Sequence, residues 1–163
     1  MAEMWDAYDK DFSKIDNVTL IRGENIPDNM YHLVGEVIVK HKDGTYLLMQ
    51  RDFNKSLGGM WELTAGGSAL KGETALDCAT RELREETGII SSDLKEMKKI
   101  VHDGYRTLFV EYLCITDADK NAIILQEGET VACKWVTKNT QLEKKPEETA
   151  THRTLELIKE LDI

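Results

Sequence analysis

The chain has 163 residues, of which 41% are hydrophobic, and this suits one folded domain with a sizeable core. Its formal net charge of −9 lacks the basic excess that a nucleic-acid-binding protein normally carries. No apolar run is long enough to cross a membrane, and the acidic first residues do not resemble a secretory signal. We therefore expect a cytoplasmic protein that binds neither nucleic acid nor membranes.

Residues 1–30 are predicted to form an N-terminal arm that packs on the domain. Within it, residues 17–21 are expected to form a short strand, and the proline and turn-forming residues at 26–29 predict a turn. Trp5 and Tyr8 are large aromatic side chains in this otherwise polar arm. We expect both to anchor the arm to the domain.

Two strands are predicted next, over residues 32–40 and 45–51, with a hairpin turn at residues 42–44. The first strand is apolar on both faces apart from Glu36, as expected for a strand covered on both sides. The polar, glycine-containing residues 52–59 predict a loop, and Trp61 begins the segment that leads to a glycine pair.

A helix is predicted between Thr74 and Gly88. The Thr74 side chain can cap a free N–H of the first turn, and Gly88 can end the helix in the left-handed conformation. Four apolar residues recur between them at helical spacing and are expected to face a core: Ala75, Leu76, Ala79 and Leu83.

The same helix carries Glu82, Glu85 and Glu86, whose spacing of i, i+3 and i+4 crowds three carboxylates on one face. Like charges at this spacing repel unless a cation neutralises them, and carboxylate oxygens suit Mg²⁺ or Mn²⁺. A solvated acidic face, with Arg81 and Arg84 supplying salt bridges, is the alternative interpretation.

After this helix, the pattern predicts strands at residues 97–102, 105–116 and 130–137, the first two joined by a turn at 103–104. A helix is predicted over residues 146–161, with two acidic residues, Glu147 and Glu148, in its first turn. Its inward stripe is expected to be Leu155, Ile158 and Leu161, with His152 and Arg153 on the outer face. The cysteines, Cys78, Cys114 and Cys133, show no zinc spacing and are expected to be reduced, buried thiols.

The segment from Gly67 to Ile89 reproduces the pattern G-x5-E-x7-R-E-U-x-E-E-x-G-U, in which U is an aliphatic residue. It resembles the signature of the Nudix hydrolases, and every defined position matches. The resemblance implies an α/β fold, namely an α/β/α sandwich around a mixed β-sheet, formed by one domain over residues 1–163. The lead-in around Trp5 and Tyr8 is similar to a subgroup related to isopentenyl diphosphate isomerase.

The resemblance also implies roles for residues in and around the motif. The Mg²⁺ or Mn²⁺ ligands would be Glu82, Glu85, Glu86 and the carbonyl of Gly66. Arg81 would orient a glutamate, and Glu73 would support it. Either Glu82 or Glu85 would accept the proton of the attacking water. Glu127 and Glu129 are candidates for an external base or a further ligand, with loop solvation as the alternative, and the spacing favours Glu129.

The implied activity is metal-dependent hydrolysis of a pyrophosphate bond in a nucleoside diphosphate linked to another moiety. The substrate stays open among dinucleoside polyphosphates, intact or oxidised nucleoside triphosphates, and nucleotide sugars. The substrate-binding candidates are Arg51, Phe53, Trp61 and Tyr105. Arg51 reaches a substrate phosphate or forms a surface salt bridge. The aromatic candidates stack a base or simply pack in the fold.

Two other functional classes compete with this interpretation. One is an isomerase of the isopentenyl diphosphate type. That chemistry resembles a family that uses a cysteine in the strand before the motif, and residues 57–70 contain no cysteine. A catalytically silent nucleotide-binding regulator is the other, although such modules often lose the motif glutamates and all are present here. The expected partner is a small-molecule nucleotide, and the sequence leaves open whether the protein forms a homodimer.

Overall fold

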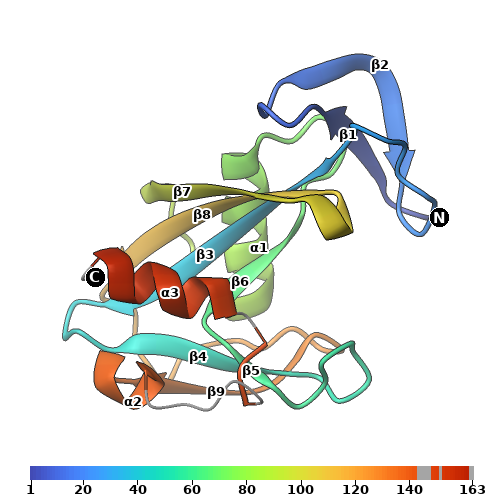
Figure 1. Ribbon diagram of the computed structural model, residues 1–163. Coiled ribbons are helices and arrows are strands. Elements are labelled where there is room, and N and C mark those ends of the chain that lie inside the picture. Colours follow the sequence, from blue (N-terminus) through green and yellow to red (C-terminus); the bar gives the residue numbers. More distant parts are fainter. Residues whose placement is uncertain (143–147, 151, 162–163) are drawn as a thin grey trace.

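The computed structural model describes residues 1–142, 148–150 and 152–161, and its elements are arranged as in Figure 1. The strands are β1 (Met4–Tyr8), β2 (Lys14–Ile21), β3 (His32–His41), β4 (Tyr46–Arg51), β5 (Trp61–Glu62), β6 (Thr64–Ser68), β7 (Leu94–His102), β8 (Thr107–Thr116) and β9 (Thr130–Val136). The helices are α1 (Ala75–Thr87), α2 (Lys138–Leu142) and α3 (His152–Leu161), with a 3₁₀ turn, η1, at Asp103–Tyr105.

Seven strands form one mixed sheet with the order β5-β4-β3-β8-β7, in which β6 also pairs with β3 and β9 with β4. β3 and β8 run parallel over ten residue pairs, and this register sets Glu36 directly beside Glu111. β3 and β4 share only the pair Lys40–Tyr46. The strands predicted at residues 32–40, 45–51 and 130–137 are confirmed, and so is the antiparallel pair that became β7 and β8.

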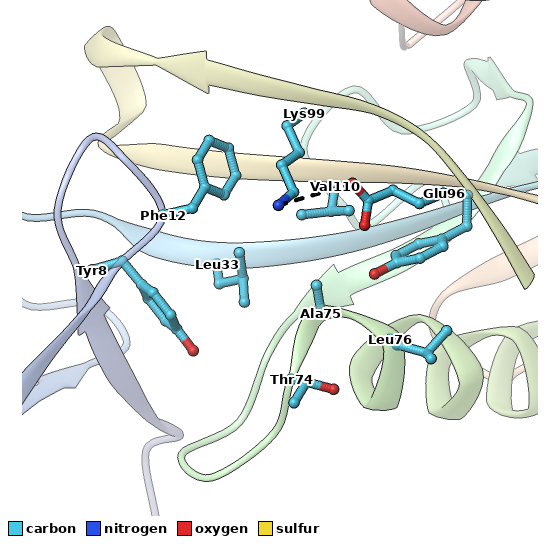
Figure 2. A pocket seen from close by; sticks show the side chains of 10 residues that line it. Tyr8, Phe12, Leu33, Thr74, Ala75, Leu76, Glu96, Lys99 and Val110 are labelled. Atoms are coloured by element: carbon cyan, nitrogen blue, oxygen red, sulfur yellow. Dashed lines mark ion pairs between the residues drawn. The ribbon is translucent and has the colours of Figure 1, made fainter.

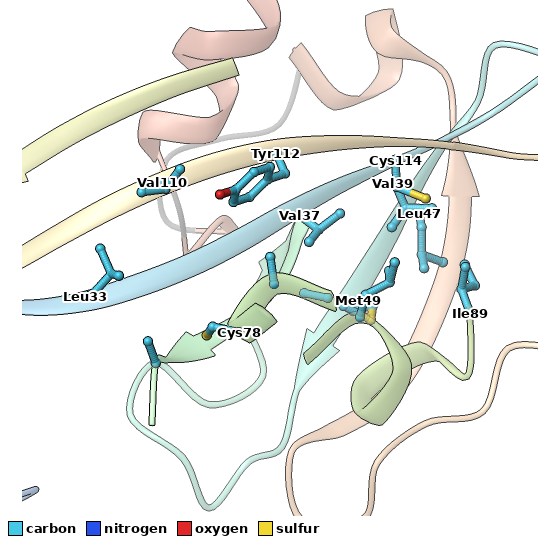
Figure 3. Close-up of a cluster of buried hydrophobic side chains, with 14 of the residues drawn as sticks. Leu33, Val37, Val39, Leu47, Met49, Cys78, Ile89, Val110, Tyr112 and Cys114 are labelled. Carbon is cyan, nitrogen blue, oxygen red and sulfur yellow. The ribbon is translucent and has the colours of Figure 1, made fainter. Parts of the chain in front are cut away.

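The two faces of the sheet bury two separate hydrophobic clusters, because side chains alternate along each strand. Leu33, Val37 and Val39 of β3 face α1 and pack in one cluster with Cys78 (Figure 3). Leu83 of α1 belongs to the same cluster. Ile38 of the same strand faces the other way and packs with side chains of α3, including Leu157 and Ile158. Helices therefore cover both faces, and the predicted α/β/α sandwich is confirmed.

Gly35 in β3 lets α1 lie directly on the sheet. A Cβ atom at this position would come within 2.6 Å of the carbonyl oxygen of Ala75 and 2.9 Å of the amide nitrogen of Ala79. Real Cβ atoms do not approach backbone this closely, so only glycine permits the contact. The close approach sets the distance between the helix that carries the motif glutamates and the sheet.

The first two strands form a hairpin of their own, β1–β2, beside the main sheet. Trp5 is buried and its ring stacks on His32, with the centroids 4.4 Å apart and the planes inclined by 18°. Tyr8 forms a backbone bridge to Tyr31. The sequence indicated β2 but not β1, because β1 is short and contains Asp6.

The prediction for Arg153 is wrong. This side chain does not lie on the outer face of α3 but reaches the sheet, where it pairs with Glu36 and with Glu111. The guanidinium also lies over the ring of Phe109, 3.7 Å from its centroid. A long arginine side chain can turn back from the edge of a helix toward a buried carboxylate, which helical spacing alone does not reveal.

Other expectations need smaller corrections. Leu76 is 41% exposed rather than in the core, and Cys78 is fully buried on the inward face of α1. α3 begins at His152, whereas a helix over residues 146–161 was expected. Glu147 and the side chain of Leu161 lie outside the described residues. Within the described ranges, none of the helices has the length and apolarity that a membrane crossing requires.

Candidate active site

The glutamates of α1 are held in register by strong caps at both helix ends. The Thr74 hydroxyl accepts from the amide of Asp77 at 3.1 Å, and the Asp77 carboxylate accepts from the amide of Thr74 at 2.9 Å. This reciprocal capping box satisfies two free donors of the first turn. At the other end Gly88 takes a φ of 77°, and its N–H donates to the carbonyl of Arg84. Both predicted helix boundaries are confirmed.

A polar pocket of about 330 Å³ opens over the acidic face of α1. It brings together Glu82, Glu85, Glu86 and Arg81 from the helix with Gly66 from β6. The remaining lining residues are Glu3, Arg22, Arg51, Lys55, Ser56, Gly67, Ser68, Gln126 and Glu129. Residues that are far apart in sequence therefore meet at the motif carboxylates, including every ligand that the resemblance implies.

Arg81 organises the carboxylates at one side of this pocket. Its Nε and Nη2 donate to the two oxygens of Glu73 at 2.7 and 2.9 Å, and Nη2 also donates to the carbonyl of Ser68. Its Nη1 reaches Glu82 at 2.6 Å and Glu85 at 3.2 Å. The guanidinium thus joins the loop before α1 to the helix and orients two of the three motif glutamates.

Gly67 leaves room for the carboxylate of Glu82. A Cβ atom on Gly67 would lie 2.5 Å from Oε1 of Glu82, so any side chain there would displace the carboxylate. At Gly66 a Cβ atom would meet the carbonyl of Gly35 at 2.6 Å and the side chain of Glu36. The backbone of the glycine pair therefore lies next to the carboxylates. Because residue 66 has no side chain, none of its own atoms covers the Gly66 carbonyl.

The pocket holds more buried negative charge than its cations offset. Burial raises the pKa of Glu86 to about 8, and the charges of Glu82 and Glu62 add to the rise. Lys55 and a hydrogen bond from the Gly66 backbone oppose it. The pKa of Glu82 is also raised, first by burial. An added cation would stabilise the ionised carboxylates.

The donor set fits a hard divalent ion, since it consists of carboxylate oxygens and a backbone carbonyl. Across the described ranges, no three acidic, histidine or cysteine side chains already converge as a metal site. The reason is visible at Arg81, whose Nη1 holds both Glu82 and Glu85. Each of these contacts uses one oxygen, Oε1 of Glu82 and Oε2 of Glu85, so the second oxygen of each carboxylate is left for an ion.

The opposite wall carries two ion pairs. Arg51 Nη1 lies 3.0 and 3.2 Å from the two oxygens of Glu62, and both side chains are largely buried. Lys55 pairs with Glu129, and burial lowers the pKa of Lys55. Arg51 therefore lines the pocket, and its salt bridge is buried rather than at the surface. Its contact with a substrate phosphate stays a prediction.

The three aromatic candidates are not brought to this pocket. Phe53 is 70% exposed and packs over Gly59, and Trp61 lies under Lys134, 4.1 Å from its ring centroid. Tyr105 is 74% exposed and stacks on His102. Their roles in substrate binding stay predictions. Conversely, Glu3 and Arg22 line the pocket and no sequence pattern pointed to them, because the arm and the motif are joined only by the fold.

A second pocket, of about 280 Å³, lies between the hairpin, the start of α1 and β7–β8 (Figure 2). Phe12 lines it with a φ of 64°, and Lys99 lies over the Phe12 ring. Its one acidic side chain, Glu96, faces Lys99. This pocket has no cluster of acids, so the chemistry points to the pocket above α1.

Comparison with known proteins agrees with the geometry. The family model described as NUDIX domain matches residues 30–157. The chain belongs to the Nudix hydrolase family. It is a pyrophosphohydrolase of that family, whose members act on nucleoside diphosphate derivatives. The Nudix hydrolase lmo0368 of Listeria monocytogenes is 34% identical over 138 residues, which cover 83% of this chain and 80% of that protein.

Solved structures share the Nudix fold at low sequence identity. DR0079 of Deinococcus radiodurans superposes with a TM-score of 0.77 at 19% identity, covering 97% of this chain and 98% of that one. A bifunctional NMN adenylyltransferase/ADP ribose pyrophosphatase of Francisella tularensis, complexed with AMP and a manganese ion, gives 0.64 at 18% identity. That match covers 81% of this chain and 41% of the Francisella chain.

Proposed function

We propose that this Nudix hydrolase cleaves the pyrophosphate bond of a nucleoside diphosphate linked to another moiety, with Mg²⁺ or Mn²⁺ bound at α1. The observation that carries the proposal is the convergence of Glu82, Glu85, Glu86 and the Gly66 backbone on one polar pocket. The raised pKa of buried Glu86 supports it, because an ionised carboxylate there needs a cation.

In this proposal Glu82, Glu85, Glu86 and the Gly66 carbonyl hold the ion, and Glu129 at the rim is a further candidate ligand. The bound ion would neutralise charge on the phosphates and lower the pKa of water. Arg81 acts as a positioning residue, since its grip on Glu73 fixes the guanidinium beside Glu82 and Glu85.

The water that attacks phosphorus must lose a proton to a nearby carboxylate. Glu85 is the most accessible of the three motif glutamates, with 36% of its side chain exposed, whereas Glu82 is 13% exposed and tied more closely to Arg81. We assign the proton to Glu85 on these grounds, and Glu82 is the alternative that a comparison of the two variants tests.

We propose one reaction, but for its substrate only a broad class, the nucleotides. The Francisella relative is named as an ADP ribose pyrophosphatase and was solved with AMP and manganese. This supports a nucleotide substrate here. Dinucleoside polyphosphates, intact or oxidised nucleoside triphosphates, and nucleotide sugars are the candidates that a substrate panel must separate.

The competing classes lack comparable support. Burial raises the pKa of the Cys78 thiol to about 12, and its Sγ donates to the carbonyl of Gly67 at 3.1 Å. It is therefore a poor acid for an isomerase of the isopentenyl diphosphate type. A silent regulator would not need the glutamates, and all three line the pocket.

The test is a panel of nucleoside diphosphate derivatives incubated with Mg²⁺, with Mn²⁺ or with a chelator, and the products identified by mass. Running the reaction in ¹⁸O-labelled water identifies the phosphorus atom that the water attacks. We expect metal-dependent release of a nucleoside monophosphate or of pyrophosphate with one labelled oxygen. Hydrolysis at full rate in the chelator would contradict the metal role.

A further inference from the structure

The open end of the hairpin β1–β2 borders the active-site pocket, although it precedes the residues that the NUDIX family model matches. Glu3 and Arg22 flank the last strand pair of the hairpin, and the Arg22 amide donates to the Glu3 carbonyl at 2.9 Å. The charge of Glu3 is close enough to Glu82 to contribute to its raised pKa. The hairpin is thus part of the wall that faces the motif carboxylates.

The hairpin is fastened to the loop that leads into α1. The amide of Lys71 donates to the carbonyl of Met4 at 2.8 Å, and the amide of Gly72 donates to the buried carboxylate of Asp6 at 2.8 Å. The Lys71 ammonium reaches the Thr19 hydroxyl at 2.6 Å. These bonds join the hairpin to the loop that precedes α1 and its glutamates.

Arg22 is the most available cation on the described wall of the pocket. Arg81 is divided among three glutamates, Arg51 is paired with Glu62, and Lys55 with Glu129. Arg22 makes one contact, from Nη1 to Glu3 at 3.0 Å, and 64% of its side chain is exposed. Among the described residues, its guanidinium forms no other hydrogen bond or ion pair.

Glu3 sets the direction of this arginine. Its Oε2 accepts from the indole N–H of Trp5 at 3.3 Å while its Oε1 accepts from Arg22. Trp5 is in turn stacked on His32 in β3. The Arg22 guanidinium is therefore oriented by a chain of contacts that runs from His32 in the central sheet through Trp5 and Glu3.

We propose that Arg22 binds a phosphate oxygen of the substrate and that the N-terminal hairpin is a substrate-binding element of this enzyme. The proposal rests on the function proposed above. A guanidinium offers a fork of donors that matches the tetrahedral oxygens of phosphate. In this proposal Arg22 acts on binding of the phosphoanhydride and carries no acid–base role.

The test compares Arg22→Ala and Arg22→Lys with Arg84→Ala, in the full chain, on the best substrate of the panel. Arg84 is an exposed arginine of α1 that lines a different surface. We expect Arg22→Ala to raise KM about tenfold or more with little change in kcat, since bonds to charged groups are strong. Arg22→Lys should restore part of the loss, and Arg84→Ala should match the wild type.

Binding of α,β-methylene ADP with Mg²⁺, measured by calorimetry, separates this proposal from the proposed function. A Kd that rises in Arg22→Ala as KM does, with an unchanged melting temperature, supports the role of Arg22. Values of KM and Kd within twofold of Arg84→Ala would overturn it while leaving the hydrolase intact. Failure of the wild type to hydrolyse any panel member would contradict the function, and the Kd comparison would still decide the role of Arg22.

Discussion

Arg81 and Glu73 form a two-pronged ion pair, with Nε–Oε1 at 2.7 Å and Nη2–Oε2 at 2.9 Å. This pair leaves only Nη1 for the pocket, where it faces both Glu82 and Glu85. One nitrogen cannot neutralise three motif carboxylates, and Glu86 receives no contact from it. The motif thus supplies the cation that positions Glu82 and Glu85, whereas Glu86 lines the pocket without a contact from that cation.

The first prediction concerns Glu85. Glu85→Gln keeps the shape of the side chain and removes its charge, so it should lower kcat about 100-fold or more, as expected for a base or metal ligand. The fold should be unchanged, because Glu85 is partly exposed. Steady-state kinetics and a melting curve measure both effects.

The matched control is Glu156→Gln, which removes an exposed glutamate of α3 that pairs only with Lys159 among the described residues. It should keep wild-type kinetics. Near-normal turnover by the Glu85 variant would remove this residue from the mechanism. A smaller loss for Glu85→Gln than for Glu82→Gln would move the proton to Glu82.

The second prediction concerns stability against pH in the presence of a chelator. The pKa of folded Glu86 is raised to about 8 and that of Glu111 to about 9, both first by burial. Above the ordinary pKa of a glutamate, the folded state therefore binds more protons than the unfolded state. The free energy of unfolding should fall as pH rises from about 5 to 8, by up to about 1.4 kcal/mol per pH unit for each group.

Glu86→Gln should flatten this slope and make the metal-free protein more stable than the wild type at pH 8. The two should differ little at pH 5, where Glu86 is protonated in the folded state. Denaturant unfolding at several pH values measures the slope. A slope in Glu86→Gln equal to that of the wild type would show that Glu86 does not titrate as the pocket implies.

The third prediction concerns Arg153. Arg153→Ala leaves the adjacent carboxylates of Glu36 and Glu111 without their cation, and these side chains are 11% and 0% exposed. We expect a loss of about 3 kcal/mol in the free energy of unfolding, typical of breaking a buried ion pair. Denaturant melts measure this loss.

Adding Glu111→Gln to Arg153→Ala should recover part of the stability, because a neutral amide replaces a buried carboxyl group that has lost its cation. Lys159→Ala, on the exposed side of the same helix, should change stability by no more than about 0.5 kcal/mol. Equal effects of Arg153→Ala and Lys159→Ala would mean that the cluster does not stabilise the docking of α3.

Sequence reasoning succeeded where the determinants are local. Thr74 and Gly88 are caps that act within a few residues, so the bounds of α1 and the shared face of its glutamates could be predicted. It failed where distant segments meet. The inward turn of Arg153 depends on the parallel register that puts Glu36 beside Glu111.

The same limit explains β1 and the pocket wall. Asp6 made β1 look unlike a strand, and its burial makes sense only with Lys14 and the Gly72 amide beside it. Arg22 gave no signal, since its place beside the carboxylates follows from hydrogen bonds between the hairpin and the loop before α1.

The most direct test of the account is Mn²⁺ binding, followed by electron paramagnetic resonance, to the wild type, Glu86→Gln and Glu156→Gln. If the acids of α1 hold the ion, the wild type and Glu156→Gln bind Mn²⁺ alike, and Glu86→Gln weakens binding about tenfold or more. Wild-type affinity in Glu86→Gln and in the matching Glu82 and Glu85 variants would contradict the central claim.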